Sequence, residues 1–181
     1  MAKTVSQYAC EMADREAIRE CHARYARAID RTDSALLRDV FWPDATLNFE
    51  GLYEGEVGAY LEQIAPGAAA QMEQTAHLMG NNTLIDIAGD SAVAESYILA
   101  FHRFPGEGKP FDLLLGGRYL DRLEKRDDVW RILSRKLVCD WFREFPDSAD
   151  WQKGFFGLQM TPGGRFPRDD SYRHFGSSKT E

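Results

Sequence analysis

Cysteine and long apolar runs are both scarce in this sequence. Its three cysteines, Cys10, Cys21 and Cys139, form an odd and widely spaced set that fits neither a disulfide framework nor a zinc site. We interpret them as reduced residues that mostly pack. No apolar run approaches the roughly 20 residues of a membrane-spanning helix. The opening segment, MAKTVSQYACEMADRE, lacks the basic and apolar regions of a signal peptide. These absences predict a cytoplasmic protein.

Basic residues are also fewer than acidic ones. The 22 lysines and arginines are outnumbered by 29 aspartates and glutamates, which gives a formal net charge of -7. Nucleic acids and anionic membrane surfaces are both bound through clusters of basic side chains. We therefore expect neither a nucleic acid nor a membrane as a partner.

The sequence does contain enough apolar side chain for one folded core. It has 181 residues, of which 44% are hydrophobic and 12% aromatic, and this length fits a single domain. Apolar periodicity and capping signals predict three helices and one short strand in the first part of the chain. The helices are expected at 15–33 with Asp14 as N-cap, at 34–41 with Ser34 as cap, and at 56–64 before a Pro66-Gly67 break; the strand is expected at 45–50.

Four strand-like segments follow, at 77–88, 92–103, 111–124 and 129–141, and their short turns imply antiparallel neighbours. Helices first and strands afterwards indicate an α+β domain. We expect a cone-shaped barrel, in which a strongly curved antiparallel or mixed sheet wraps around the N-terminal helices and encloses a pocket. This domain is predicted to span 1–145, followed by an irregular tail, 146–181, that packs on the domain or on a neighbouring subunit.

Alternation along 92–103 sorts small side chains, mostly alanine, onto one face of the strand. Small residues on the concave face would leave room for a pocket, and His102 at the end of this row would look into it. The opposite face carries apolar residues that include Val93, Tyr97 and Phe101. We therefore expect a homodimer or homotrimer formed through that face.

Three kinds of ionisable residue fall where burial would be costly without a partner. Asp30 and Asp33 come where the apolar stripe of the first helix ends, and His77 is the best candidate to meet one of them. Helical periodicity alone does not choose between the two aspartates. Arg135 has apolar neighbours along its strand, where a guanidinium needs an anion or several acceptors.

Each of these residues also has a structural interpretation. Asp30 could cap a turn, Arg135 could form a structural ion pair, and both strand histidines could be satisfied packing residues. His22 and His174 are interpreted as surface or packing residues.

Several segments occur in the order found in one known group. They are YARAIDRTD, FWPDATLNFEG, TAHLMGNN, AESYILAFHR and GGRYLDRLEKRDDVWRI, and they span roughly residues 13–141. This order resembles the SnoaL-like group of the nuclear-transport-factor-like superfamily, whose fold is a cystatin-like α+β barrel. The resemblance implies the fold but no single reaction, because the fold hosts several chemistries and also binding modules.

Two enzyme families of that superfamily, the hexachlorocyclohexane dehydrochlorinases and the scytalone dehydratases, have motifs that match residues here. The Asp and His motifs of both fall on Asp30 and His77. The Arg of the first family falls on Arg135, five residues after Trp130, and the second His of the other family falls on His102. The resemblance thus implies these four as catalytic residues, and we expect substrate-binding roles for Tyr25, Tyr53, Trp42 and Leu133.

The implied reaction is an elimination in which His77 abstracts a proton. Asp30 would fix the imidazole tautomer and stabilise the imidazolium, while Arg135 or His102 would stabilise negative charge or assist the leaving group. The expected substrate is a small hydrophobic molecule, aromatic ones included, that undergoes dehydration, dehydrohalogenation or a related carbon-carbon lyase or isomerase step, as in aromatic compound catabolism.

No cofactor or metal is expected, because the sequence has no Gly-rich phosphate loop, HExxH or paired CxxC motif. Two alternatives stay open. One is a non-catalytic ligand-binding or oligomerising subunit, similar to the small subunit of ring-hydroxylating dioxygenases. The other is a polyketide-cyclase-like aldol catalyst.

Overall fold

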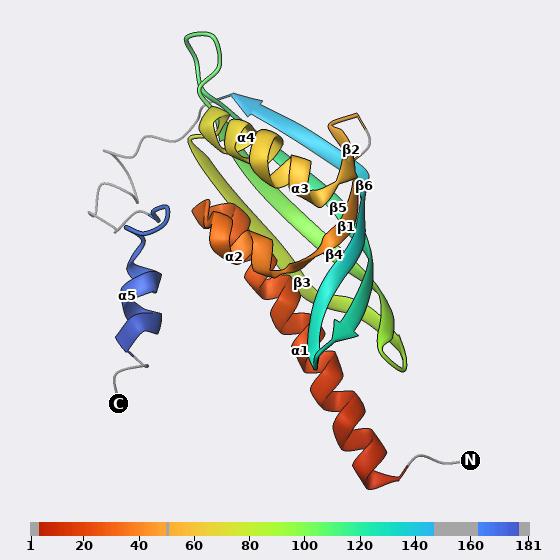
Figure 1. The fold of residues 1–181 in the computed structure, drawn as a ribbon. Coiled ribbons are helices and arrows are strands. Elements are labelled where there is room, and N and C mark those ends of the chain that lie inside the picture. Colours follow the sequence, from red (N-terminus) through yellow and green to blue (C-terminus); the bar gives the residue numbers. More distant parts are fainter. Residues whose placement is uncertain (1–3, 50, 147–162, 178–181) are drawn as a thin grey trace.

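A long N-terminal helix lies against a curved sheet of six strands (Figure 1). The computed structural model of the protein describes residues 4–49, 51–146 and 163–177. Its helices are α1 (Val5–Arg31), α2 (Ser34–Asp39), α3 (Val57–Ala59), the π-helical turn η1 (Tyr60–Ile64), α4 (Ala65–Gln71) and α5 (Asp170–Ser177). Its strands are β1 (Phe41–Phe49), β2 (Tyr53–Glu56), β3 (Gln74–Ala88), β4 (Ser91–Phe104), β5 (Phe111–Arg126) and β6 (Val129–Pro146).

The strand order in the sheet is β2-β1-β6-β5-β4-β3. Neighbouring strands are antiparallel except for β1 and β6, which are parallel. The sheet is not closed into a barrel, but it curves around the helices as a cone does. The predicted α+β class, with a mixed sheet wrapped around the N-terminal helices, is confirmed. Among the described helices, none is both long and apolar enough to cross a bilayer.

The first helix begins earlier than the sequence predicted. Thr4 is its N-cap: the Thr4 hydroxyl accepts from the Gln7 N–H at 3.2 Å, and the Gln7 side chain accepts from the Thr4 N–H at 2.8 Å. This reciprocal pair is a capping box. Asp14, the predicted cap, lies inside the helix and accepts from the indole N–H of Trp130 at 2.8 Å. That prediction was wrong because the first turns of α1 extend beyond the apolar stripe.

The end of α1 and the start of α2 share one tight turn. Thr32 adopts a left-handed conformation with φ 54°, and Asp33 then caps α2 by accepting from the Leu36 N–H at 3.0 Å. Ser34, the predicted cap, is therefore the first helical residue. An aspartate at the N-cap satisfies a backbone donor that would otherwise have no partner within the helix.

The predicted break at Pro66-Gly67 does not occur. The helical path runs through α3, η1 and α4 as far as Gln71. Pro66 directly follows the π-helical turn η1, in which the Ala65 N–H donates to the Tyr60 carbonyl. This wider local winding accompanies the proline inside the helical path. The proline in the sequence was therefore not sufficient to predict the end of this helical segment.

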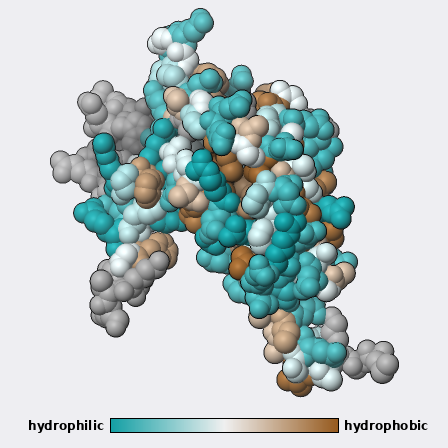
Figure 2. Space-filling model, viewed as in Figure 1, coloured by the Kyte–Doolittle hydropathy of each residue, from teal (hydrophilic) through white to brown (hydrophobic). Residues whose placement is uncertain are grey.

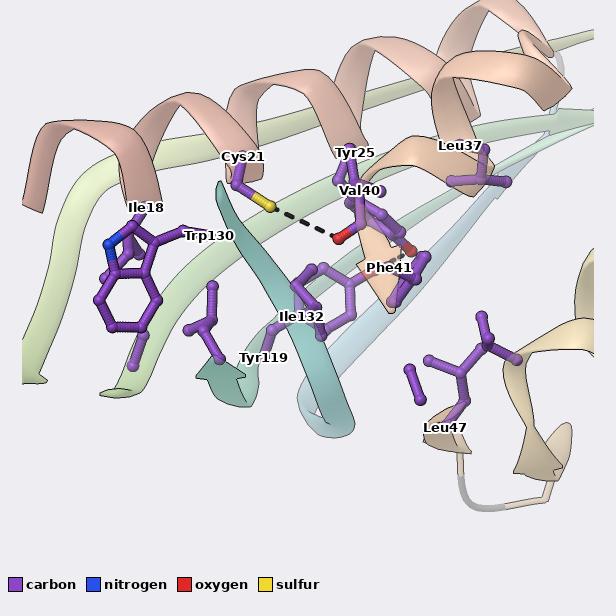
Figure 3. Close-up of a cluster of buried hydrophobic side chains, with 14 of the residues drawn as sticks. Ile18, Cys21, Tyr25, Leu37, Val40, Phe41, Leu47, Tyr119, Trp130 and Ile132 are labelled. Atoms are coloured by element: carbon purple, nitrogen blue, oxygen red, sulfur yellow. Dashed lines mark hydrogen bonds between the residues drawn. The ribbon is translucent and has the colours of Figure 1, made fainter. Parts of the chain in front are cut away.

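The core lies between α1 and the strands β1, β5 and β6 (Figure 3). Ile18, Cys21 and Tyr25 extend from one side of α1, as their spacing predicted, and meet Phe41 and Ile132; all five are at most 4% exposed. Cys21 donates a weak hydrogen bond to a backbone carbonyl at 3.6 Å, and burial raises the pKa of its thiol to about 12. Cys21 is thus a packing residue, as predicted, whereas Cys10 and Cys139 are exposed, so the prediction that the cysteines mostly pack was wrong for these two.

The predicted alternation along β4 is confirmed. Its alanines at alternate positions and Ser96 are buried beneath the helices, whereas Val93 and Tyr97 are 54% and 51% exposed on the outer face. Whether copies of the chain associate through this outer face stays a prediction. In Figure 2 the solvent-facing side of α1 is mainly hydrophilic, and hydrophobic atoms gather between α2 and the helices α3 and α4.

A β-bulge resets the alternation of β6. The pairing of β5 with β6 skips Leu133, so one extra residue stands on β6. Before the bulge the buried side chains are Trp130 and Ile132, and after it the buried side chain is Arg135. Val129, which unbroken alternation would put on the same face as Arg135, is 43% exposed. Trp130 and Ile132 have even numbers and Arg135 an odd number. The extra residue of the bulge is what allows all three side chains to point into the interior.

Gly117 marks a close approach of β5 to β6 that we expect to limit its replacement. A methyl group at Gly117 would lie 2.4 Å from the carbonyl oxygen of Val138, and a backbone atom within a sheet cannot move away cheaply. Gly117→Ala should lower the free energy of unfolding by about 1 to 3 kcal/mol, measured by urea unfolding. Gly58→Ala is the control, because no atom lies within 4 Å of the added methyl. Equal stability of Gly117→Ala and the wild type would contradict the close approach.

Candidate active site

A buried aspartate and a histidine meet where the last turn of α1 lies beside β3. Asp30 Oδ1 is 2.7 Å from His77 Nδ1, and Asp30 Oδ2 accepts the backbone N–H of His77 at 2.9 Å. The two side chains are 14% and 7% exposed. The 2.7 Å contact lies in the range of about 2.6 to 3.2 Å predicted for a base and its orienting carboxylate. Asp33 does not compete, because it caps α2 and accepts from the Tyr172 hydroxyl at 2.8 Å.

The hydrogen bonds to Asp30 define the tautomer of His77. An ionised carboxylate only accepts, so Nδ1 must carry the proton that it shares with Asp30. The other ring nitrogen, Nε2, then has a lone pair, and it has no hydrogen-bond partner among the described residues. His77 lines the cavity described next. His77 thus belongs to the wall of a partly enclosed space, and Asp30 leaves its Nε2 unused.

A cavity of about 450 Å³ lies between the sheet and the helices. This volume falls within the usual range of small-molecule sites, roughly 300 to 1,000 Å³, and the predicted pocket is confirmed. Its wall is mostly aliphatic and aromatic, with Phe49, Tyr60, Ile98 and Leu115 as examples. Polar groups on this wall come from two histidines, four tyrosines and five other side chains, which are Thr32, Ser34, Gln71, Thr75 and Arg165.

His102 reaches the same cavity from β4. Its ring centroid is 5.3 Å from that of His77, and its Nδ1 lies 3.0 Å from the Thr75 hydroxyl oxygen. Burial, and then the neighbouring His77, lowers the pKa of His102 to about 4. His102 is therefore neutral near pH 7 and can donate or accept a hydrogen bond without carrying charge.

Arg135, in contrast, does not line the cavity. Its Nε and Nη2 donate to the two carboxylate oxygens of Asp121, both at 2.7 Å, and its side chain is fully buried. The guanidinium lies between the rings of Tyr25 and Tyr119, 4.0 and 4.1 Å from their centroids. Burial opposes the charge of Arg135, yet Asp121 raises its pKa above the ordinary value. At this point the cavity wall is formed by Tyr25 and Tyr119, and Arg135 packs against their rings without lining the cavity.

The same buried network contains His22, which the sequence predicted as a surface or packing residue, and Asp121, which the sequence did not single out. His22 Nε2 is 3.0 Å from Asp121 Oδ2, and His22 Nδ1 is 3.3 Å from the Ser96 hydroxyl. Burial alone would raise the pKa of Asp121, but Arg135 and His22 lower it to about 2. His22 is thus a buried, hydrogen-bonded residue. Its spacing of four residues from Ile18 and three from Tyr25 was a signal for burial, but its partner lies in a distant strand.

The four expected substrate-binding residues divide into two pairs. Tyr25 and Tyr53 line the cavity, and the Tyr53 hydroxyl donates to the backbone carbonyl of Glu56 at 2.6 Å. Trp42 and Leu133 are not part of the cavity wall. The Trp42 indole N–H donates to a carbonyl of β5 at 3.0 Å and two arginines cover its ring, while Leu133 occupies the bulge of β6.

The C-terminal segment 163–177 docks at the end of α1. The Arg31 guanidinium is 3.3 Å from Asp169, and Arg165 donates to the Met72 carbonyl and borders the cavity. Residues Asp170–Ser177 form α5, so the prediction of an irregular tail was wrong for them. The remainder of that prediction, residues 147–162, lies outside the described residues.

No group of three or more His, Cys, Asp or Glu side chains that could hold a metal ion occurs in the described ranges.

Solved structures that resemble this one identify its fold. A scytalone-dehydratase-like protein from Novosphingobium aromaticivorans matches with a TM-score of 0.67 and 21% identity, covering 87% of this chain and 96% of that one. A protein of unknown function with a cystatin-like fold from Nostoc punctiforme matches with a TM-score of 0.58 and 18% identity, covering 77% of this chain and 96% of that one. The fold is thus of the cystatin-like α+β type.

Residues 10–136 match the SnoaL-like domain, and the chain belongs to the SnoaL-like family. Gamma-hexachlorocyclohexane dehydrochlorinase of Sphingobium indicum is 25% identical over 133 residues, which cover 72% of this chain and 83% of that protein. A solved structure of a type 2 hexachlorocyclohexane dehydrochlorinase matches with a TM-score of 0.66 and 21% identity, covering 85% of this chain and 97% of that one.

The low pKa of His102 predicts a pH-dependent stability. An unfolded histidine titrates near 6.5, so between pH 6.5 and about 4 the unfolded chain binds a proton that folded His102 does not. The free energy of unfolding should therefore fall as the pH falls through this window. His102→Gln should remove this contribution, up to about 3 kcal/mol, in urea unfolding at pH 7 and pH 4. The control is His174→Gln, in exposed α5; a pH dependence unchanged by His102→Gln would count against the assignment.

Proposed function

We propose that this protein is a lyase of the dehydratase type that acts on a small hydrophobic molecule without a cofactor. The observation that carries the proposal is the contact of Asp30 with both the ring and the backbone N–H of His77 at the wall of an apolar cavity. A purely structural pair would not need a basic ring nitrogen directed at a ligand-sized space. The cavity would bind the apolar part of the substrate, and the dyad would carry out the chemistry.

In the proposed reaction, His77 Nε2 takes a proton from a carbon atom of the substrate. The electron pair of that C–H bond forms a carbon-carbon double bond, and the leaving group departs from the adjacent carbon with its own electron pair. Asp30 stabilises the imidazolium that forms, because its carboxylate is already aligned with Nδ1–H. Low local polarity strengthens this interaction, because water does not screen it.

His102 is well placed to assist the leaving group. Its ring lies beside that of His77 at the cavity wall, and as a neutral imidazole it can donate a hydrogen bond to a departing oxygen. When the leaving group is hydroxide, it needs one proton to become water, and the proton that His77 has gained supplies it. The dyad is then restored for the next turnover.

The relatives support the same class of reaction. Similar proteins bear the names dehydrochlorinase and dehydratase, and both names describe the removal of a proton together with a leaving group from adjacent atoms. Family membership alone would leave the chemistry open, because one fold can host several functions. The dyad and the enclosed cavity are therefore what favour an enzyme over a binding subunit.

Replacing either dyad residue tests the proposal. His77→Ala and Asp30→Asn should each lower the rate constant for turnover by about 100-fold or more, as expected for loss of a general base or of the group that orients it. Two probes cover the two leaving groups: 3-hydroxy-1-tetralone, with 1-naphthol as the measured product, and gamma-hexachlorocyclohexane, with chloride release as the measured product.

Asp33→Asn is the matched control for this test. It changes a carboxylate three residues from Asp30 that caps α2 and does not contact His77. Because asparagine caps a helix about as well as aspartate, we expect little change in stability, with turnover retained. Wild-type rates in both His77→Ala and Asp30→Asn would refute the proposed mechanism.

A further inference from the structure

One permanently charged side chain stands on the wall of the cavity. Among the described residues that line it, Arg165 is the only lysine or arginine, and none is an aspartate or a glutamate. His102, with its lowered pKa, is neutral near pH 7. The chain as a whole carries a formal net charge of -7. The permanent charge on the cavity wall is therefore opposite in sign to the charge of the protein.

The C-terminal segment holds Arg165 between the end of α1 and the start of β3. Arg165 Nη2 donates to the backbone carbonyl of Met72, two residues before β3. The next residue, Phe166, donates its backbone N–H to the carbonyl of Arg31, the last residue of α1, at 2.7 Å. A carbonyl oxygen is neutral, so the bond to Met72 positions the guanidinium without cancelling its positive charge.

The carboxylate that lies closest to Arg165 along the chain is directed to other donors. Asp169 Oδ2 accepts the backbone N–H of Gly164 at 2.8 Å and is 3.3 Å from the Arg31 guanidinium. Asp169 Oδ1 accepts the backbone N–H of Ser171 at 3.1 Å. These contacts fix the turn that carries Arg165 and join it to the end of α1. They leave the carboxylate of Asp169 outside the described cavity wall.

We propose that Arg165 binds a carboxylate of the substrate at the mouth of the cavity, so that the enzyme acts on hydrophobic carboxylic acids. This inference rests on the proposed function and names its substrate class. The mouth is defined here as the part of the wall at which Arg165 is exposed to solvent. Hydrogen bonds between a guanidinium and a carboxylate are roughly twice as strong as those between neutral groups.

A group with one negative charge suits this mouth better than a phosphate ester with two. Asp33 and Asp169 are both buried near it, one directly after Thr32 of the wall and the other four residues after Arg165. A second negative charge on the ligand would be repelled by these carboxylates. Thr32 and Ser34, the wall residues on either side of Asp33, are polar but uncharged.

The rest of the cavity suits the remainder of such a molecule. Its wall is mostly aliphatic and aromatic, and it includes His77. Asp30 is not part of the wall, and both of its oxygens accept from His77. With the carboxylate of the substrate at Arg165, the apolar body would fill the cavity and bring a C–H bond to the dyad. The guanidinium would also attract the acid from solution, against the net negative charge of the protein.

A matched pair of unreactive ligands tests the proposal. 2-Naphthoate and 2-naphthamide have nearly the same shape, differ in charge at neutral pH, and carry no leaving group for an elimination. Isothermal titration gives the ratio of the Kd for 2-naphthamide to the Kd for 2-naphthoate, which should exceed one in the wild type. In Arg165→Gln this ratio should fall by about 5-fold or more, the size expected for the loss of a charge-assisted contact at a partly exposed site. The new amide can still donate to the Met72 carbonyl.

Arg173→Gln is the matched control for this variant. It removes the same charge from the same segment, but Arg173 is exposed, pairs with Asp170 and does not line the cavity. The ratio should be the same in this variant as in the wild type. Arg165→Lys should have a ratio between those of the wild type and Arg165→Gln, because a cation remains at the mouth.

Three results would overturn the inference. They are a wild-type ratio of one or less, an unchanged ratio in Arg165→Gln, and an equal fall in Arg165→Lys and Arg165→Gln, which would show that the segment had lost its position rather than its charge. Raising the salt concentration should weaken the binding of 2-naphthoate by the wild type and leave that of 2-naphthamide unchanged. Equal salt dependence of the two ligands would also contradict it.

The binding test is independent of catalysis, because neither ligand reacts. A preference for 2-naphthoate that depends on Arg165, together with fully active dyad variants, would refute the proposed function alone. No such preference, together with inactive dyad variants, would refute the carboxylate site alone.

Discussion

One carboxylate joins the long helix to the sheet at the point where the cavity forms. Asp30 accepts from the ring and from the backbone N–H of His77, so both of its oxygens are used. A buried carboxylate without such donors would be costly, and hydrogen bonds to a charged group contribute roughly 1.5 to 3 kcal/mol each. The same two bonds therefore hold α1 against β3 and fix the tautomer of His77. The packing of α1 on β3 and the tautomer of His77 therefore both depend on the Asp30 side chain.

A second buried charge supports the opposite wall. The Arg135 and Asp121 pair, with His22 beside it, lies under the tyrosines that line the cavity. Buried ion pairs often add little net stability compared with apolar packing, because both charges lose their hydration. We therefore assign this network a positional role: it sets the rings, and through them the hydroxyls. The resemblance implied that Arg135 is a catalytic residue. In this structure Arg135 does not line the cavity, and we assign it the role of positioning the rings of Tyr25 and Tyr119.

Local patterns predicted most of the fold. The alternation of β4 identified its buried face, and the spacing of Ile18, Cys21 and Tyr25 identified the buried face of α1. Alternation failed in β6, because the bulge at Leu133 arises from pairing with β5, which the strand's own residues do not encode in any simple way. Asp14 was misplaced as a cap for a different reason: polar residues continue the helix beyond its apolar stripe, and periodicity has no signal there.

Periodicity alone did not predict which residues form the site, and the choice of Asp30 with His77 depended on the resemblance to known motifs. Asp30 and Asp33 were equivalent by periodicity, and the tight turn at Thr32 is what directs one to His77 and the other to α2. The partnership of His22 with Asp121 joins distant parts of the chain. The periodicity of side chains within one helix or strand gives no information about such a contact. Trp42 was expected at the cavity, but its ring is instead covered by arginines outside the cavity wall.

The central claim is that His77 presents an unprotonated Nε2 to the cavity while Nδ1–H is held by Asp30. Nitrogen-15 NMR of the histidine rings measures this directly, with the His77 signals assigned by their loss in His77→Ala. The account predicts, for the neutral ring, a proton on Nδ1 and none on Nε2, and a shift towards the other tautomer in Asp30→Asn. A neutral His77 protonated on Nε2 in the wild type, or a tautomer unaffected by Asp30→Asn, would contradict it.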